Sequence, residues 1–167
     1  MNPPLFAVDT NFLMDLAHPR DVAHDALDII RKRVPRAFVL ATERALAELN
    51  RFATTPALGK QALAQKAQEL MFERGIQPTL LTDVQASIAD IIAGKLLDHR
   101  LLPWEEQNDA VILAEAAALG CDVLISSDSH LRDIDRTRLE AVMQASGVPV
   151  VITRKPEDIV RMFAGRR

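Results

Sequence analysis

The chain has 167 residues, of which 49% are hydrophobic and 26% charged, a composition typical of one folded domain. Its first residues lack the basic start and apolar run of a signal peptide. No stretch reaches the roughly 18 apolar residues of a membrane span, so we expect a cytoplasmic protein with no membrane contact. The single cysteine, Cys121, argues against a disulfide framework or a thiolate zinc cluster. The net charge of -3 argues against a domain coated with positive charge for nucleic acid, but four acids gathered at one site would leave +1 for the rest of the chain, so the bulk charge decides nothing.

Short extended runs alternate with helical ones along the chain. The extended runs predict strands at residues 5–8, 37–41, 122–126 and 148–152, and a shorter piece at 79–81. Amphipathic spacing, interrupted at proline and glycine, predicts helices at about 11–17, 21–33, 42–53, 60–74, 83–97, 105–120, 138–145 and 156–163. This alternation indicates an α/β fold with a parallel sheet of four to five strands sandwiched by helices. We expect one domain over residues 1–167, with a helical pair at about 60–97.

Two of the expected strands are followed by a carboxylate. Asp9 comes after the first strand, and Asp128 comes after the strand at 122–126. Ligands of an open parallel sheet bind beyond the carboxyl ends of its strands, so both acids face one crevice if these strands are neighbours. Acids gathered in a cleft repel one another and lose hydration, so they persist only by sharing protons, meeting cations or holding a metal. We therefore expect further acids at the same place.

Two more acids interrupt the apolar faces of predicted helices. Glu48 occupies a position where the three-and-four spacing calls for an apolar residue, and Asp109 begins the apolar stripe of a later helix. Both side chains are expected to point toward the body of the protein. Asp109 also has a simpler reading, because an acid in a first helical turn stabilises the helix dipole. Glu106 reads as an exposed acid, although it lies one turn earlier and can reach the cleft.

These residues together resemble the PIN-domain nucleases. The shared features are Asp9-Thr10-Asn11 after the first strand, Glu48 in the following helix, Asn108-Asp109 at a helix start, and Ser126-Ser127-Asp128 after a later strand. Among bacterial members the chain is similar to the VapC-type toxins of toxin–antitoxin systems. The resemblance implies a cleft of three or four acids, Mg²⁺ or Mn²⁺ as cofactor, RNA as substrate, and an antitoxin as partner. It also implies that Ser126 lines the site. Many members carry another acid at the position that is His130 here.

Oxygen-rich sites of this kind suit Mg²⁺, which keeps several waters and needs only a few carboxylates. We predict that four residues are catalytic and metal-binding: Asp9, Glu48, Asp109 and Asp128. Asp9 and Asp128 would bind the metal directly, while the other two complete its shell or orient the attacking water. Asn11 and Ser126 are predicted to fix the carboxylates by hydrogen bonds.

Two other classes of protein share part of this pattern. A phosphatase of the haloacid dehalogenase type needs a second aspartate two residues after the first, where this chain has Asn11. A PIN-like module that binds RNA or a protein without cutting it is the main alternative, and metal-dependent cleavage would distinguish it from an enzyme. The helical pair at 60–97 carries more apolar residues than one sheet edge needs, so a homodimer or an antitoxin could cover the excess.

Overall fold

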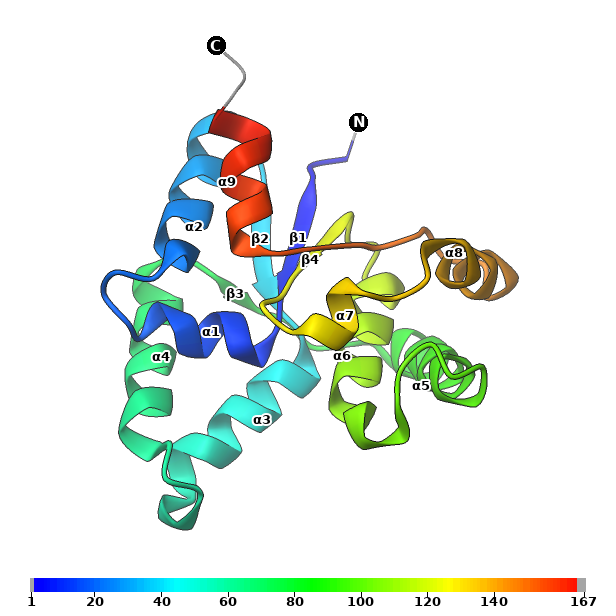
Figure 1. Cartoon of the computed structure of the whole chain (residues 1–167), viewed down its shortest axis with the longest axis horizontal. Coiled ribbons are helices and arrows are strands. Elements are labelled where there is room, and N and C mark those ends of the chain that lie inside the picture. The colour runs from blue at the N-terminus through cyan, green and yellow to red at the C-terminus, as the bar shows by residue number, and fades with distance from the viewer. Residues whose placement is uncertain (1, 165–167) are drawn as a thin grey trace.

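The computed structural model describes residues 2–164. At its centre lies a five-stranded sheet with helices packed on both faces (Figure 1). The strands are β1 (Leu5–Val8), β2 (Phe38–Ala41), β3 (Gln77–Pro78), β4 (Val123–Ile125) and β5 (Ile152–Arg154). Their order in the sheet is β3-β2-β1-β4-β5, and every neighbouring pair is parallel. The predicted α/β fold with a parallel sheet is therefore confirmed.

The central strand β1 aligns the segments that carry the predicted site. Its last residue, Val8, lies opposite Ala41 of β2 and Ile125 of β4. The next residue, Asp9, donates its N–H to the carbonyl of Ile125 at 3.3 Å, which continues the ladder to the end of β4. The segments after β1, β2 and β4 therefore leave the sheet side by side at its carboxyl edge.

Nine α-helices connect and flank the strands in residues 2–164. They are α1 (Thr10–Leu16), α2 (Val22–Arg33), α3 (Glu43–Thr54), α4 (Gln61–Glu73), α5 (Asp83–Asp98), α6 (Gln107–Ala118), α7 (Ser129–Arg132), α8 (Arg136–Ala145) and α9 (Pro156–Ala164). Two 3₁₀ turns, Pro56–Leu58 and Trp104–Glu106, precede α4 and α6. Several of these helices begin directly after a residue whose side chain accepts a backbone N–H of the first turn. Before α3, for example, the Thr42 hydroxyl accepts the N–H of Ala45.

Three elements differ from the sequence prediction. The short strand expected at 79–81 lies instead at Gln77–Pro78, where it pairs with Leu40 and Ala41 of β2. The last strand begins at Ile152 rather than spanning 148–152, because it pairs with Val123–Ile125 and because Pro149 has no N–H to donate to a ladder. The short helix α7 was not predicted. It exists because the Asp128 carboxylate accepts the N–H groups of its first turn.

Two apolar clusters fill the two sides of the sheet. Helices α5, α6 and α8 contribute to one cluster, while α1, α2, α4 and α9 contribute to the other. The two helices expected as a pair at 60–97 therefore lie apart: α4 packs against α3 and α1, and α5 packs against α6 and α8. Cys121 is buried in the first cluster, as core filling would require.

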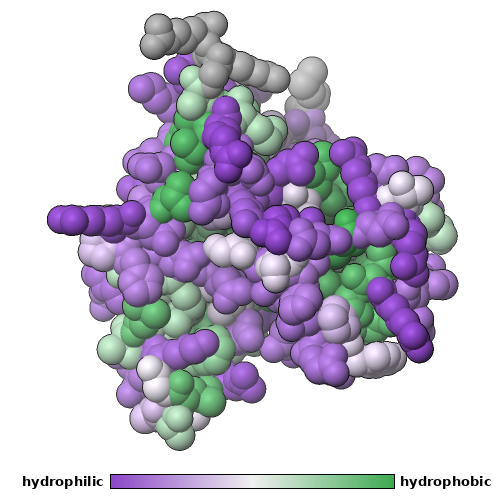
Figure 2. All heavy atoms as spheres, viewed as in Figure 1, coloured by the Kyte–Doolittle hydropathy of each residue, from purple (hydrophilic) through white to green (hydrophobic). Residues whose placement is uncertain are grey.

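The surface shown in Figure 2 is mostly hydrophilic; its largest apolar group lies on the right, near α5 and α8, and smaller ones lie near α9 and at the lower left. Within the described part of the chain, no helix combines the length and the apolar character that a membrane crossing requires.

Candidate active site

Three aspartates from three separate segments line one cavity of about 250 Å³. Asp9 follows β1, Asp128 follows β4, and Asp109 lies in the first turn of α6. Glu48 from α3 and Glu106 from the turn before α6 line the same cavity. The fold thus brings the four predicted acids together, and Glu105 and Glu106 line the cavity with them.

Asp9 is the most buried of these acids, with 1% of its surface exposed. One carboxylate oxygen accepts the backbone N–H of Phe12 at 2.8 Å, which caps α1, and the other accepts the hydroxyl of Ser126. Burial raises the pKa of Asp9 to about 7, although these two hydrogen bonds lower it; the charges of Asp15 and Asp128 raise it further. A bound cation would offset this unfavourable burial of charge.

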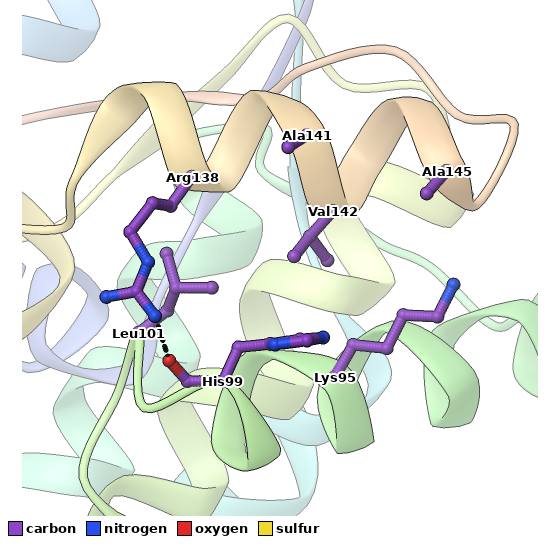
Figure 3. Close-up of a pocket in the computed structure, with 7 residues that line it drawn as sticks. All are labelled: Lys95, His99, Leu101, Arg138, Ala141, Val142 and Ala145. Carbon is purple, nitrogen blue, oxygen red and sulfur yellow. Dashed lines mark hydrogen bonds between the residues drawn. The ribbon is translucent and has the colours of Figure 1, made fainter.

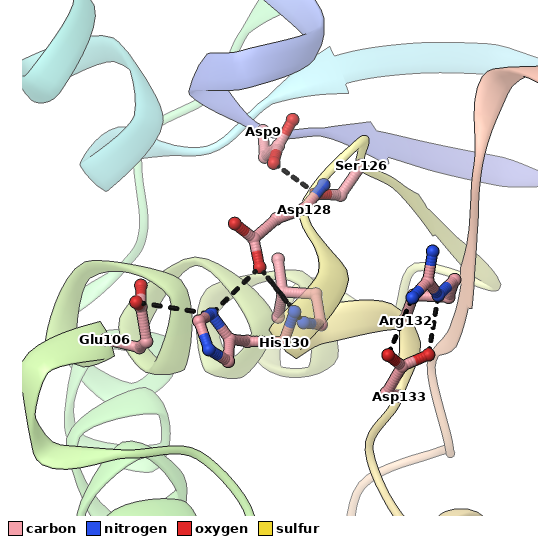
Figure 4. Close-up of polar contacts among 8 residues, drawn as sticks. Asp9, Glu106, Ser126, Asp128, His130, Arg132 and Asp133 are labelled. Atoms are coloured by element: carbon pink, nitrogen blue, oxygen red, sulfur yellow. Dashed lines mark hydrogen bonds and ion pairs between the residues drawn. The ribbon is translucent and has the colours of Figure 1, made fainter.

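Asp128 is held by the start of α7. Its Oδ1 accepts the backbone N–H groups of His130 at 2.7 Å and Leu131 at 3.4 Å. Ser126 accepts the backbone N–H of Asp128 at 2.9 Å while its hydroxyl donates to Asp9, so this one serine connects the two aspartates (Figure 4). Ser126 therefore lies between the two aspartates and contacts both residues.

His130 lies at the rim of the acid cluster. Its Nδ1 is 3.2 Å from Oε1 of Glu106 and 3.5 Å from Oδ1 of Asp128 (Figure 4). His130 therefore links two acids of the cluster.

Asp109 is half-buried beside the other acids. Burial raises its pKa to about 8, and the negative charge of Asp128 adds to this effect. Its contact with the Glu106 carboxyl group and the charge of Asp9 raise the pKa further. The charge of Asp128 therefore acts on both Asp9 and Asp109.

Glu48 faces the cavity from α3 and has both carboxylate oxygens engaged. The hydroxyl of Thr10 donates to Oε2 at 2.5 Å, and the side-chain amide of Asn108 donates to Oε1 at 3.1 Å. Asn11 lines the cavity but is exposed, and none of the described hydrogen bonds joins its side chain to an acid. Thr10, its neighbour in the motif, makes such a bond instead.

Sequence reasoning missed several residues of the cavity wall. Thr10 and Asn108 stand next to predicted acids within the motif, so their proximity was a usable signal. Lys60 carried no such signal, because its position depends on the turn between α3 and α4. Among the residues that line the cavity, Lys60 is the only cationic one, and its Nζ lies 4.7 Å from the ring centroid of Phe52.

The donor chemistry of this site fits a hard divalent cation. In residues 2–164 no three His, Cys, Asp or Glu side chains are already arranged as a metal shell. Mg²⁺ nevertheless prefers carboxylate oxygens and retains several waters, so a complete protein shell is not required. The carboxylates of Asp9, Asp109 and Asp128 are therefore suitable ligands for Mg²⁺ or Mn²⁺.

A second hollow of about 260 Å³ lies away from these acids, between α5 and α8 (Figure 3). Leu101, Val142 and two alanines give it an apolar wall, and Lys95, His99 and Arg138 line its edge. Arg138 donates a hydrogen bond to the backbone carbonyl of His99. No acid lines this hollow, so it offers no carboxylate ligands for Mg²⁺ and is not part of the candidate active site.

The fold and the site define a class of protein: an α/β domain whose parallel sheet carries a cluster of acids beyond the carboxyl ends of its central strands. The comparisons with known proteins identify the family. Residues 6–137 match the model of the PIN domain, and the chain belongs to this family.

Solved structures with the same fold include toxin–antitoxin proteins of three bacteria. VapBC2 from Rickettsia felis, bound to a DNA fragment from its promoter, aligns with a TM-score of 0.61 and 14% identity over 90% of this chain and 98% of that one. VapBC-1 from nontypeable Haemophilus influenzae aligns with a TM-score of 0.58 and 17% identity over 92% and 98%. VapC20 from Mycobacterium tuberculosis, a sarcin-ricin loop cleaving toxin, aligns with a TM-score of 0.50 and 17% identity over 87% and 98%. No protein with a curated description matches the sequence.

Proposed function

We propose that this protein is a divalent-metal-dependent endoribonuclease that hydrolyses RNA phosphodiester bonds. The observation that carries the proposal is the convergence of Asp9, Asp109 and Asp128, from three distant segments, on one cavity. Membership of the PIN domain family supports a nuclease. RNA as the substrate is supported by the similar fold of VapC20, a sarcin-ricin loop cleaving toxin.

In the proposed mechanism the three aspartates would hold Mg²⁺ or Mn²⁺ at the carboxyl edge of the sheet. When bound, the ion supplies charge stabilisation to the phosphodiester and lowers the pKa of an attacking water. Ser126 fixes the positions of Asp9 and Asp128 relative to each other through its two hydrogen bonds. Glu48 completes the acid cluster on the α3 side.

Glu48 has a second task in this proposal, because it fixes two polar neighbours. Its carboxylate accepts hydrogen bonds from Thr10 and from Asn108, which stand beside Asp9 and Asp109 in the chain. The contact therefore ties α1 and α6 to α3 around the cavity. Loss of the Glu48 charge would both weaken metal binding and release these neighbours.

We also propose that the protein is the toxin component of a toxin–antitoxin pair. Two structures with a similar fold are those of VapBC2 and VapBC-1, which supports an antitoxin as a protein partner. Co-expression with the product of the adjacent reading frame should yield a stable complex that suppresses RNA cleavage. A product that neither binds the chain nor changes its activity would count against this role.

An RNA cleavage assay tests the proposed activity. Purified protein is expected to cut single-stranded or structured RNA with Mg²⁺ or Mn²⁺ and to lose this activity when a chelator is added. If varied RNAs are bound but never cut in either metal, the chain is a PIN-like binding module rather than an enzyme.

A further inference from the structure

We propose that the RNA strand leaves the cavity lined by Asp9, Asp109 and Asp128, the acid cavity, by crossing α3. There Arg44 and Arg51 bind the phosphates next to the scissile phosphate. This inference rests on the proposed ribonuclease function and assigns part of its substrate-binding surface. It follows from a smaller hollow beside the acid cavity, from helical spacing and from the pairing of charges.

The smaller hollow shares part of its wall with the acid cavity. It has a volume of about 100 Å³ and is lined by Arg44, Ala47, Glu48, Arg51 and Asn108. Glu48 and Asn108 also line the acid cavity, and a hydrogen bond of 3.1 Å joins their side chains. A strand bound at the acids therefore meets this hollow when it passes the pair formed by Glu48 and Asn108.

The two arginines share the face of α3 that carries Glu48. Arg44 comes four residues before Glu48, and Arg51 comes three residues after it, so each lies about one turn away. At about 1.5 Å of rise per residue, the two arginines are separated by about 10 Å along the helix axis. This spacing suits contacts with phosphates along a strand rather than with a single small anion.

The positive charges of both arginines are available for a ligand. The Glu48 carboxylate between them is already occupied by Thr10 and Asn108. No ion pair described within residues 2–164 involves Arg44 or Arg51, and both side chains are exposed. A guanidinium group matches phosphate geometry through paired N–H donors, so these groups are suited to RNA.

The acid cavity itself repels phosphates, and cations at its rim offset this repulsion. The Arg51 guanidinium lies 5.7 Å from the ring centroid of Phe52, and the Lys60 ammonium lies 4.7 Å from it. Phe52 and Lys60 line the acid cavity, whereas Arg51 lines the smaller hollow. Cationic groups thus lie both in the acid cavity, at Lys60, and in the smaller hollow, at Arg51. A surface that binds several phosphates of one strand requires such a series of positive charges.

The test measures binding of a labelled single-stranded RNA by fluorescence anisotropy at several salt concentrations. It is run in chelator and, with Asp109→Asn to block cleavage, in Mn²⁺. Each phosphate contact with a single strand contributes about 0.7 to the slope of log affinity against log salt. The pair Arg44→Ala and Arg51→Ala should therefore lower the slope by about 1.4, and the corresponding lysine pair should retain most of it.

Lys32→Ala with Arg33→Ala provides a matched control. It removes the same charge from the end of α2, which precedes β2 at the opposite, amino edge of the sheet, and it should leave the slope unchanged. The proposed phosphate binding by Arg44 and Arg51 would be overturned if the control lowered the salt slope of RNA affinity equally, or if the arginine pair did not lower it. Either result would leave the ribonuclease proposal intact. If the wild-type chain neither binds nor cuts RNA, both proposals fail.

Discussion

The substitution Asp9→Asn should make the metal-free protein more stable, although it removes a residue of the proposed active site. Burial raises the pKa of the Asp9 carboxyl from 3.8 to about 7. This difference of about 3 pKa units, at about 1.36 kcal/mol each, means that ionised Asp9 disfavours the folded state by about 4 kcal/mol. Asp9→Asn removes the charge and keeps an oxygen that can accept the N–H of Phe12.

The substitution also weakens the contact with Ser126, at a cost of about 1 kcal/mol. The net expectation is a free energy of unfolding higher by about 3 kcal/mol at pH 8. For a chain of this size, about 2–4 °C per kcal/mol converts this gain into a melting temperature higher by about 6–12 °C. Asp90→Asn, on the exposed surface of α5, is the matched control and should change the melting temperature little.

The increase in the free energy of unfolding caused by Asp9→Asn should grow as the pH rises. Between about pH 4 and pH 7 the folded protein retains a proton on Asp9 that the unfolded chain has lost. The stability of the wild type therefore falls as the pH rises through this range, and this part of the fall is absent in Asp9→Asn. The difference between the two proteins should be small near pH 4 and complete above pH 7.

Thermal unfolding in chelator, measured across this pH range, checks the reasoning. Added Mg²⁺ or Mn²⁺ should then stabilise the wild type by mass action, by about 2.7 kcal/mol at 100 times the dissociation constant, and should stabilise Asp9→Asn much less. A variant that is less stable than the wild type at pH 8, or that gains as much from the metal, would refute the proposed electrostatics of the site.

Three further predictions concern the neighbours of the aspartates and the surface. Glu48→Gln should lower the rate of RNA cleavage by about 10- to 100-fold, because it removes a charge and mispairs with Thr10 or Asn108; an unchanged rate would remove Glu48 from the mechanism. Ser126→Ala should also lower the rate of RNA cleavage by about 10- to 100-fold, while circular dichroism shows a folded chain. Full activity would show that the two hydrogen bonds of Ser126 are dispensable. Ile91, an exposed apolar residue of α5, predicts self-association: light scattering at micromolar concentration should give a dimer for the wild type and a monomer for Ile91→Glu, and a monomeric wild type would contradict this.

The central part of the fold could be predicted because its signals are local. Buried runs such as Leu5–Val8 and Val123–Ile125 are short, apolar and followed by polar residues, so they read as strands of a parallel sheet. Asp9 and Asp128 could be predicted as neighbours because parallel strands end at one edge. Glu48 could be predicted because it interrupts an apolar stripe.

Other features depend on contacts that the sequence does not specify locally. An apolar stripe shows that a helix packs but not on which face of the sheet, and α4 and α5 consequently lie in different clusters. The hydrogen bond from Thr10 to Glu48 joins residues 38 positions apart. Lys60 reaches the cavity only because the turn at Pro56–Leu58 directs the chain back from α3.

Single-turnover cleavage of one labelled RNA in Mn²⁺ by the wild type and by three aspartate variants tests the central claim most directly. Asp9→Asn, Asp109→Asn and Asp128→Asn keep the size of each side chain but remove the charge that would hold the metal. If each carboxylate supplies several kcal/mol of transition-state stabilisation, each variant should be slower by several orders of magnitude, while Asp90→Asn should cleave like the wild type. Cleavage at the wild-type rate by the Asp9 and Asp128 variants would contradict the claim that these acids form the catalytic metal site.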